Sequence, residues 1–390
     1  MPFATTNPAT GKIEKEFPTM TPAEVDALLD QAVAAFGEYR RTTYAERARH
    51  LITAAELLEG EVPDVARILT TEMGKTFAAA KAEVSKSAVA LRWFADNAER
   101  LLTDEAISTK AKTSYVHYQP MGAVLAVMPW NFPLWQVIRF AAPALMVGNV
   151  GLLKHASNVP QTALAIEDLF RRAGLPQGVF TNLFVESKDV AQLIDDPRIA
   201  AKRFVVHDDI ADDFLARFTE AMDALVVGDP FDAGTDVGPI VTEAQRAELV
   251  NQVEAARAQG AHVHAGSPVP PGDGWYFPPT VVSGVTVEMP VAQEEIFGPV
   301  AMVLRVPDLD AAITAANATP FGLGSSVWTN DADEIARCIE EIDAGAVFVN
   351  AMVASTPELP FGGVKKSGYG RELSELGLKE FTNQKTVWIG

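Results

Sequence analysis

A short loop with two prolines around a tryptophan and an asparagine is a segment whose residue types could do chemistry. It spans Met128–Pro133, reads MPWNFP, and directly follows the apolar run GAVLAV. Because open α/β sheets bind ligands at the carboxyl ends of their strands, this position makes the loop a candidate site. The prolines restrict the backbone, so the amide of Asn131 could be held as a donor to a developing oxyanion. The alternative is an ordinary turn capped by Asn131, with Trp130 as packing.

A lysine stands at the end of the next apolar run. Lys154 follows VGLL and precedes His155, Ala156 and Ser157, at the sheet edge where Asn131 is also expected. A cation there suits the ribose or phosphate of a nucleotide. The alternative is a solvated lysine at a strand end. The sequence contains no G-x-G-x-x-G, so any dinucleotide must bind without that fingerprint.

A third segment, Gln293–Pro299, reads QEEIFGP and places two carboxylates before an aromatic residue and a Gly-Pro turn. One carboxylate could accept hydrogen bonds from a ribose while Phe297 packs on a flat ring. The alternative is a charged turn on a surface loop.

These segments, in this order, resemble the aldehyde dehydrogenase superfamily over nearly the whole chain. The landmarks are PWNFP, the strand end at Lys154, DVGPI at 236–240, EEIFGP, and PFGGVKKSGYGRE at 360–372. Within the superfamily, the combination of KHAS, ELPFGG and GYGREL is most similar to bacterial NADP-preferring succinate-semialdehyde dehydrogenases. The resemblance implies oxidation of succinate semialdehyde, or a similar short aldehyde, to the carboxylate with reduction of NADP.

The same resemblance implies roles for the matching residues. Asn131 would be the oxyanion donor. The cofactor would be held by a set drawn from all three segments: Trp130, Asn131, Lys154, His155, Ala156, Ser157, Glu295 and Phe297. Relatives that prefer NAD often carry a glutamate where this chain has Ser157, and a carboxylate would repel a 2′-phosphate. We therefore expect a preference for NADP, with NAD possible.

Arg139 and Ser355 match positions that grip a distal carboxylate in succinate-semialdehyde enzymes. Arg139 lies in an otherwise apolar stretch, LWQVIRFAAPAL. A buried arginine needs a partner, and an anionic substrate would supply one. An arginine paired to a structural carboxylate is the alternative.

The chemistry of the family needs a cysteine nucleophile and a glutamate base, and both are missing from the expected place. Segments resembling LELGG and GQSC do not occur, and Ala200 runs directly into Ala201. By comparison, roughly 65 residues are absent, about half a domain. The single cysteine, Cys338, is expected on the apolar face of a helix with Ile335, Ile339 and Ile342, as an inert core residue.

Three interpretations of this gap follow. The chain is a working dehydrogenase whose sequence omits an internal segment, or a catalytically dead deletion variant that acts as a binding or assembly scaffold. The third is a defective product that exposes sheet edges and aggregates.

The order of elements predicts an α/β aldehyde dehydrogenase-like fold with a Rossmann-type cofactor domain. We expect residues 1–200 to form a truncated cofactor domain, 201–350 a catalytic domain, and 351–390 a return to the first. A strand at 113–119 should pair with the C-terminal strand near 385–389 as an oligomerisation arm, and the resemblance implies a homodimer or homotetramer. Apolar spacing predicts helices at 22–39, 45–59, 62–74, 77–101, 134–145, 162–173, 188–194, 209–225 and 242–259.

Composition excludes several classes of protein. The 390 residues carry 32 Lys and Arg against 51 Asp and Glu, a formal charge of −19, which disfavours nucleic acid and anionic membrane surfaces as partners. We see no membrane span and no secretory signal and expect a cytoplasmic protein. One cysteine excludes a cysteine metal cage, and His262 and His264 are better explained by a surface strand than by a metal site.

Overall fold

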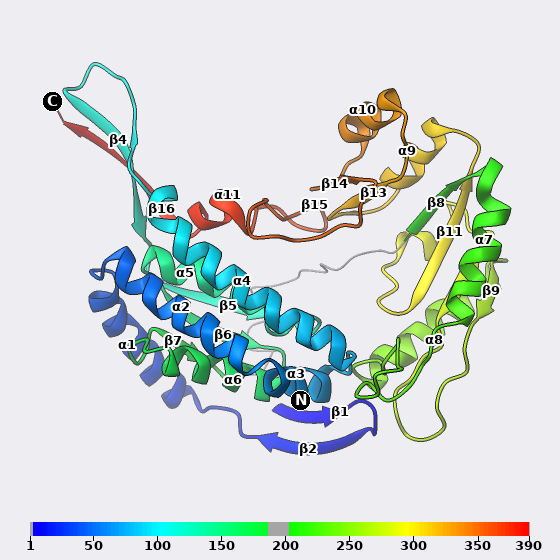
Figure 1. Cartoon of the computed structure of the whole chain (residues 1–390), viewed down its shortest axis with the longest axis horizontal. Coiled ribbons are helices and arrows are strands. Elements are labelled where there is room, and N and C mark those ends of the chain that lie inside the picture. Colours follow the sequence, from blue (N-terminus) through cyan, green and yellow to red (C-terminus); the bar gives the residue numbers. More distant parts are fainter. Residues whose placement is uncertain (1–2, 186–202, 390) are drawn as a thin grey trace.

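The computed structural model describes residues 3–185 and 203–389. Figure 1 shows two α/β parts, with the first half of the chain at lower left and residues 203 to about 349 at right. A two-stranded arm projects from the first part. The predicted helix at 188–194 and the junction of Ala200 with Ala201 lie outside the described residues.

Four helices occupy the first hundred residues, and local sequence explains where each begins. Helices α1 (Pro22–Tyr39) and α2 (Tyr44–Gly60) both start with a reciprocal capping box, Thr21 with Glu24 and Thr43 with Glu46. Helix α3 (Val62–Met73) ends at Gly74, whose φ of 84° favours glycine. Helix α4 (Phe77–Leu101) is capped by Thr76. These bounds agree with the predicted ones within two residues.

The first sheet is parallel, with the order β5-β6-β7. Its strands are β5 (Ala123–Met128), β6 (Val150–His155) and β7 (Phe180–Asn182), connected by α5 (Trp135–Val147) and α6 (Pro160–Arg172). Every residue of β6 is buried. Strand β5 pairs only with β6 among the described residues, and its Leu125 is 44% exposed. This strand therefore forms an edge of the described sheet.

The second sheet, in the order β8-β11-β10-β9, organises the other part. Strands β8 (Arg203–His207), β11 (Val300–Val306) and β10 (Thr280–Ser283) are parallel, and β9 (His262–Ala265) is antiparallel to β10. The cores on this sheet are much smaller than the one that spans the first part. The further elements of this half are α7 (Asp208–Asp223), α8 (Glu243–Ala258), α9 (Leu309–Asn317), α10 (Ala332–Glu341), η2 (Pro290–Gln293), β12 (Phe321–Gly322), β13 (Ser325–Val327), β14 (Val347–Val349) and β15 (Val364–Lys365).

The C-terminal segment returns to the first part. Helix α11 (Ser374–Lys379) follows Leu373, and both Leu373 and Leu378 are buried in the first core. Strand β16 (Thr382–Ile389) then pairs antiparallel with β4 (Thr113–Pro120) along its whole length, which is the strand pair that the sequence predicts. Figure 1 shows these two strands extending away from the rest of the molecule. Two short pieces complete this part: the hairpin of β1 (Phe3–Asn7) and β2 (Lys12–Phe17), and β3 (Glu105–Ala106) beside β4.

One prediction about the core is wrong. Cys338 of α10 is buried, with 4% exposed, but Ile339 is 56% exposed. The apolar stripe of this helix is narrow, and a step of one residue turns the side chain by about 100° away from it. No helix in residues 3–185 or 203–389 is long and apolar enough to cross a membrane.

Candidate functional site

Two parallel strands bring the first two predicted segments to one edge. Met128, the last residue of β5, is in register with His155, the last residue of β6. The loop that carries Asn131 therefore leaves the sheet beside the turn that carries Ser157. This is the carboxyl edge of a parallel sheet, as predicted.

His155 holds the loop of residues 128–133 by a hydrogen bond to its last residue. Its side chain is 1% exposed, its Nε2 lies 2.8 Å from the carbonyl oxygen of Pro133, and its Nδ1 accepts a hydrogen bond from the N–H of Ala156 at 2.9 Å. Burial is the main cause that lowers the pKa of His155 to about 4. The ring is therefore neutral at neutral pH, with its proton on Nε2 donated to Pro133. A direct contact of His155 with a cofactor stays a prediction.

The amide of Asn131 is oriented by a neighbour on the next helix. Gln136 Nε2 donates to Asn131 Oδ1 at 2.8 Å, and Asn131 is buried. Since the amide oxygen is occupied, the polar group that Asn131 can offer to a ligand is its NH₂. That is the polarity an oxyanion donor needs.

A buried ion pair that the sequence analysis missed holds the start of α5. Glu83 of α4 accepts hydrogen bonds from the backbone N–H groups of Leu134 and Trp135, each at 2.9 Å. Its other oxygen pairs with Lys75, whose Nζ lies 4.4 Å from the ring centroid of Phe132. The available signal was a glutamate on an alanine- and valine-rich helix face, where a charge needs a partner.

The third predicted segment meets the first. Trp130 and Phe297 lie with ring centroids 5.3 Å apart and planes at 88°, an edge-to-face contact between the two halves of the chain. Glu295 is half-buried on the same segment, and its carbonyl oxygen accepts from Gln252 Nε2 at 3.1 Å. Trp130 and Phe297, both predicted to contact the cofactor, therefore lie together although they come from opposite halves of the chain.

Lys154 and Ser157 flank the same edge. Lys154 is buried, and desolvation lowers its pKa. Ser157 is half-buried, and its carbonyl oxygen accepts from the N–H of Ala4 at 3.2 Å, which ties this turn to β1. Ser157, for which a role in cofactor choice stays a prediction, therefore carries its hydroxyl on a turn that is bonded to β1.

Arg139 and Ser355 both lie near Trp135 of α5: Arg139 lies over its ring, and Ser355 binds a lysine that lies over the same ring. Arg139 is 12% exposed and pairs through Nη2 with Glu372 Oε2 at 3.0 Å. Desolvation lowers its pKa, and Glu372 opposes that effect. Ser355 Oγ accepts a hydrogen bond at 2.9 Å from Lys86 Nζ, which lies 4.3 Å from the ring centroid of Trp135. The structure therefore shows the structural carboxylate partner of Arg139, and binding of an anionic substrate by Arg139 stays a prediction.

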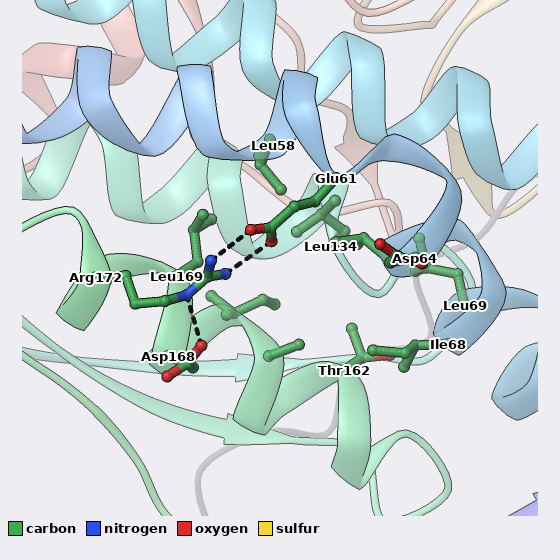
Figure 2. Close-up of a pocket in the computed structure, with 13 residues that line it drawn as sticks. Leu58, Glu61, Asp64, Ile68, Leu69, Leu134, Thr162, Asp168, Leu169 and Arg172 are labelled. Carbon is green, nitrogen blue, oxygen red and sulfur yellow. Dashed lines mark hydrogen bonds and ion pairs between the residues drawn. The ribbon is translucent and has the colours of Figure 1, made fainter.

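A cavity of about 190 Å³ lies elsewhere, between α2, α3 and α6. Figure 2 shows the guanidinium of Arg172 at its rim between Glu61 and Asp168, with apolar side chains behind them. None of the predicted site residues lines it. We therefore assign it no part in the site.

The structure places no thiolate near these residues. Cys338 lies in α10, and the pKa of its thiol is raised, mainly because the thiol is buried. His264, on a surface strand, binds Asp223 through Nε2 at 2.7 Å. Among residues 3–185 and 203–389 there is no group of three or more His, Cys, Asp or Glu placed to hold a metal ion.

Comparison with known proteins gives the family. The model of the aldehyde dehydrogenase family matches residues 1–201 and 198–387, so the match breaks at the predicted gap. A Mycobacterium avium protein named NADP-dependent succinate-semialdehyde dehydrogenase is 48% identical over 458 positions, covering 100% of this chain and 97% of its own. Those 458 positions exceed the 390 residues of this chain by 68.

Other similar proteins agree. A Mycobacterium tuberculosis protein with the same type of name is 47% identical, with full coverage of both chains. The crystal structure of a Streptococcus pyogenes succinic semialdehyde dehydrogenase in complex with NADP⁺ is 30% identical, with a TM-score of 0.94 and 99% coverage of each chain. The family match covers nearly the whole sequence, and this chain belongs to the aldehyde dehydrogenase family.

Proposed function

We propose that this protein, in a form that also carries the family's catalytic cysteine and glutamate, is an NADP-dependent dehydrogenase of short aldehydes with a distal carboxylate, and that succinate semialdehyde is its substrate. The observation that carries the proposal is the full-length similarity to proteins named for this activity. The surroundings of Trp135 support the substrate class, because Arg139 and Lys86 both lie over its ring and Lys86 also donates to Ser355.

The residues at the carboxyl edge fit NADP. Trp130 and Phe297 offer aromatic faces, and Lys154 offers a cation. Ser157 puts no carboxylate where a 2′-phosphate would be repelled. When bound, this cofactor accepts a hydride from the substrate carbon. A Ser157→Glu variant should shift preference from NADP toward NAD in equilibrium binding; a variant that still prefers NADP would contradict this role.

The chain with the present sequence should bind these ligands without completing the oxidation. The family's chemistry needs a cysteine thiolate, and the only cysteine is buried in α10. The observation that favours an incomplete enzyme is the break in the family match at residues 198–201. A binding or assembly role is therefore the second candidate function.

A segment transplant tests both candidates. The segment of the M. avium relative that corresponds to the break in the family match would be inserted between Ala200 and Ala201. We expect no NADPH formation from the present chain and clear formation from the chimera, with succinate semialdehyde preferred over butanal. A chimera that oxidises both aldehydes equally well would contradict the substrate class. Turnover by the present chain that survives Cys338→Ala would reveal a nucleophile outside the family's scheme.

We also infer that the arm of β4 and β16 joins subunits into a homodimer or homotetramer. Trp388 is 58% exposed at its tip, and Ile389 is 47% exposed. Exposed apolar side chains on a projecting strand pair suit contact with a second copy. Sedimentation should show an oligomer that Trp388→Lys weakens; an unchanged oligomer would place the interface elsewhere.

A further inference from the structure

Lys86 occupies a position in α4 that neither the fold nor the family resemblance explains. Its Nζ donates to Ser355 Oγ at 2.9 Å and lies 4.3 Å from the ring centroid of Trp135. Its side chain is half-buried. Lys86 thus links the first hundred residues to the C-terminal segment at the point where the substrate carboxylate is proposed to bind.

A second cation shares this locality. The guanidinium carbon of Arg139 lies 5.8 Å from the centroid of the same Trp135 ring and 5.4 Å from that of Phe361. Burial and then the charge of Arg139 lower the pKa of Lys86, against an opposing effect of Glu83. The Nε of Arg139 is buried and has no hydrogen-bond partner. Two desolvated cations and an unpaired donor therefore stand together on an aromatic surface.

The nearby carboxylates do not balance these charges. Glu83 already accepts two backbone N–H groups and pairs with Lys75. Glu372 pairs with Arg139 and is about half exposed. No carboxylate in the described part of the chain forms an ion pair with Lys86. Three cations thus face two anions, and a bound anion would restore neutrality.

We infer that Lys86 is a specificity-determining residue that binds the distal carboxylate of the substrate together with Arg139. The inference rests on the proposed function and adds to it a ligand from α4. Lys86 supplies a point charge and Arg139 a planar donor group, so the two can bind different oxygens of one carboxylate. A neutral aldehyde gains neither interaction, and the site selects against it by leaving both cations unpaired.

A purely structural role for Lys86 makes a different prediction. If Lys86 only tethers α4 to Ser355, its loss should weaken charged and neutral ligands alike. Lys86→Gln separates these roles, because glutamine keeps a hydrogen-bond donor and removes the charge. Lys86→Arg keeps the charge. Lys81→Gln is the matched control, since Lys81 is exposed on the same helix and lies over Phe77.

The test is calorimetric titration of the whole chain, in the presence of NADP, with succinate and with succinamide as its neutral analogue. We expect Lys86→Gln to weaken succinate binding about tenfold or more and to leave succinamide within about twofold. Lys86→Arg should retain most of the affinity for succinate, and Lys81→Gln should change neither ligand. Circular dichroism of each variant shows whether it is folded.

Each contrary outcome is distinct. Unchanged succinate binding by a folded Lys86→Gln, or equal losses for both ligands, would overturn the inference. If Arg139→Gln weakens succinate binding while Lys86→Gln does not, the proposed function stands and the inference falls. If the unaltered chain binds succinamide but not succinate, the anionic substrate class and the inference both fail. Should Lys86→Gln not fold, loss of succinate binding in Lys86→Arg decides against it.

Discussion

Glu72 and Glu83 do the same structural task at two places beside the first sheet. Each carboxylate accepts hydrogen bonds from two consecutive backbone N–H groups at the start of a helix, α6 for Glu72 and α5 for Glu83. Such groups lack partners within the helix and lie at the positive end of its dipole. Both glutamates are buried. The two regions therefore share one way of fixing a helix behind a strand.

Their remaining partners differ. Glu72 accepts from the hydroxyls of Thr5 and Thr162, each at 2.7 Å, and burial, the largest influence, raises its pKa. Glu83 instead pairs with Lys75, and Lys86 follows one turn along the same helix. Only the helix capped by Glu83 carries predicted site residues. The comparison indicates that the helix cap is a feature of the fold common to both regions, whereas Lys75 and Lys86 distinguish the region that contains the predicted substrate residue Arg139.

The largest expected effect comes from breaking the Glu83 pair. Glu83→Gln keeps an oxygen for the helix cap but leaves Lys75, whose side chain is 9% exposed, without its counterion. Removing one partner of a buried pair costs about 3–5 kcal/mol of unfolding free energy. Urea unfolding of the variant measures this loss.

The control removes both charges. Lys75→Met combined with Glu83→Gln should recover a large part of the stability, because no buried charge is then left alone. The exposed pair of Arg92 and Glu59 offers a contrast, and Glu59→Gln should cost less than about 1 kcal/mol. If the double variant is as unstable as the single one, the ion pair is not what distinguishes the surroundings of Glu83 from those of Glu72.

The second effect concerns His155, which holds the far end of the loop that precedes α5. The pKa of His155 is about 4 in the folded protein and ordinarily 6.5. Between pH 4 and pH 6.5, therefore, the imidazole is protonated in the unfolded chain but not in the folded one. The stability from His155 is therefore complete above pH 6.5 and is lost as the pH falls toward 4, by roughly 3 kcal/mol in all. Unfolding curves measured between pH 6.5 and pH 4 should show a smaller loss of stability for His155→Gln than for the unaltered chain. The same loss in both proteins would contradict a buried neutral ring.

The difference between these two regions also shows what the sequence could predict. The bounds of α1 and α4 followed from apolar spacing, which is a local signal. The meeting of Asn131 with Lys154 at one edge followed from strand order. Ile339 was placed wrongly because spacing gives a periodicity but not the width of the buried stripe.

The partners of buried charges could not be predicted. Arg139 was expected to need an anion, yet nothing in its local sequence pointed to Glu372. Lys75, Glu83 and Lys86 were missed because helical spacing does not say which element a polar face will meet. These contacts join segments far apart in the chain, and only the tertiary fold selects them.

A third, smaller effect is expected at Glu72. Glu72→Gln replaces one acceptor oxygen with an NH₂ that cannot accept from the backbone N–H of Thr162. One lost hydrogen bond at a buried group costs about 1–3 kcal/mol. Since no lysine within residues 3–185 or 203–389 pairs with Glu72, no second substitution of the kind used at Glu83 should rescue it. A loss at Glu72 equal to that at Glu83, measured by the same urea unfolding, would remove the distinction between the two caps.

The smallest effect tests whether the site is assembled across the two halves. Trp130→Leu and Phe297→Leu, singly and together, form a double-mutant cycle, and an edge-to-face pair should give a coupling of about 1 kcal/mol. Phe140 and Phe381, whose ring centroids lie 5.7 Å apart within the first core, are the control pair. Coupling in both pairs would mean that the two halves of the chain meet at Trp130 and Phe297 although the segment present in the relatives is absent. Coupling in the control alone would mean that the first core is packed as described while the contact between the two halves does not form, because Phe140 and Phe381 lie within that core.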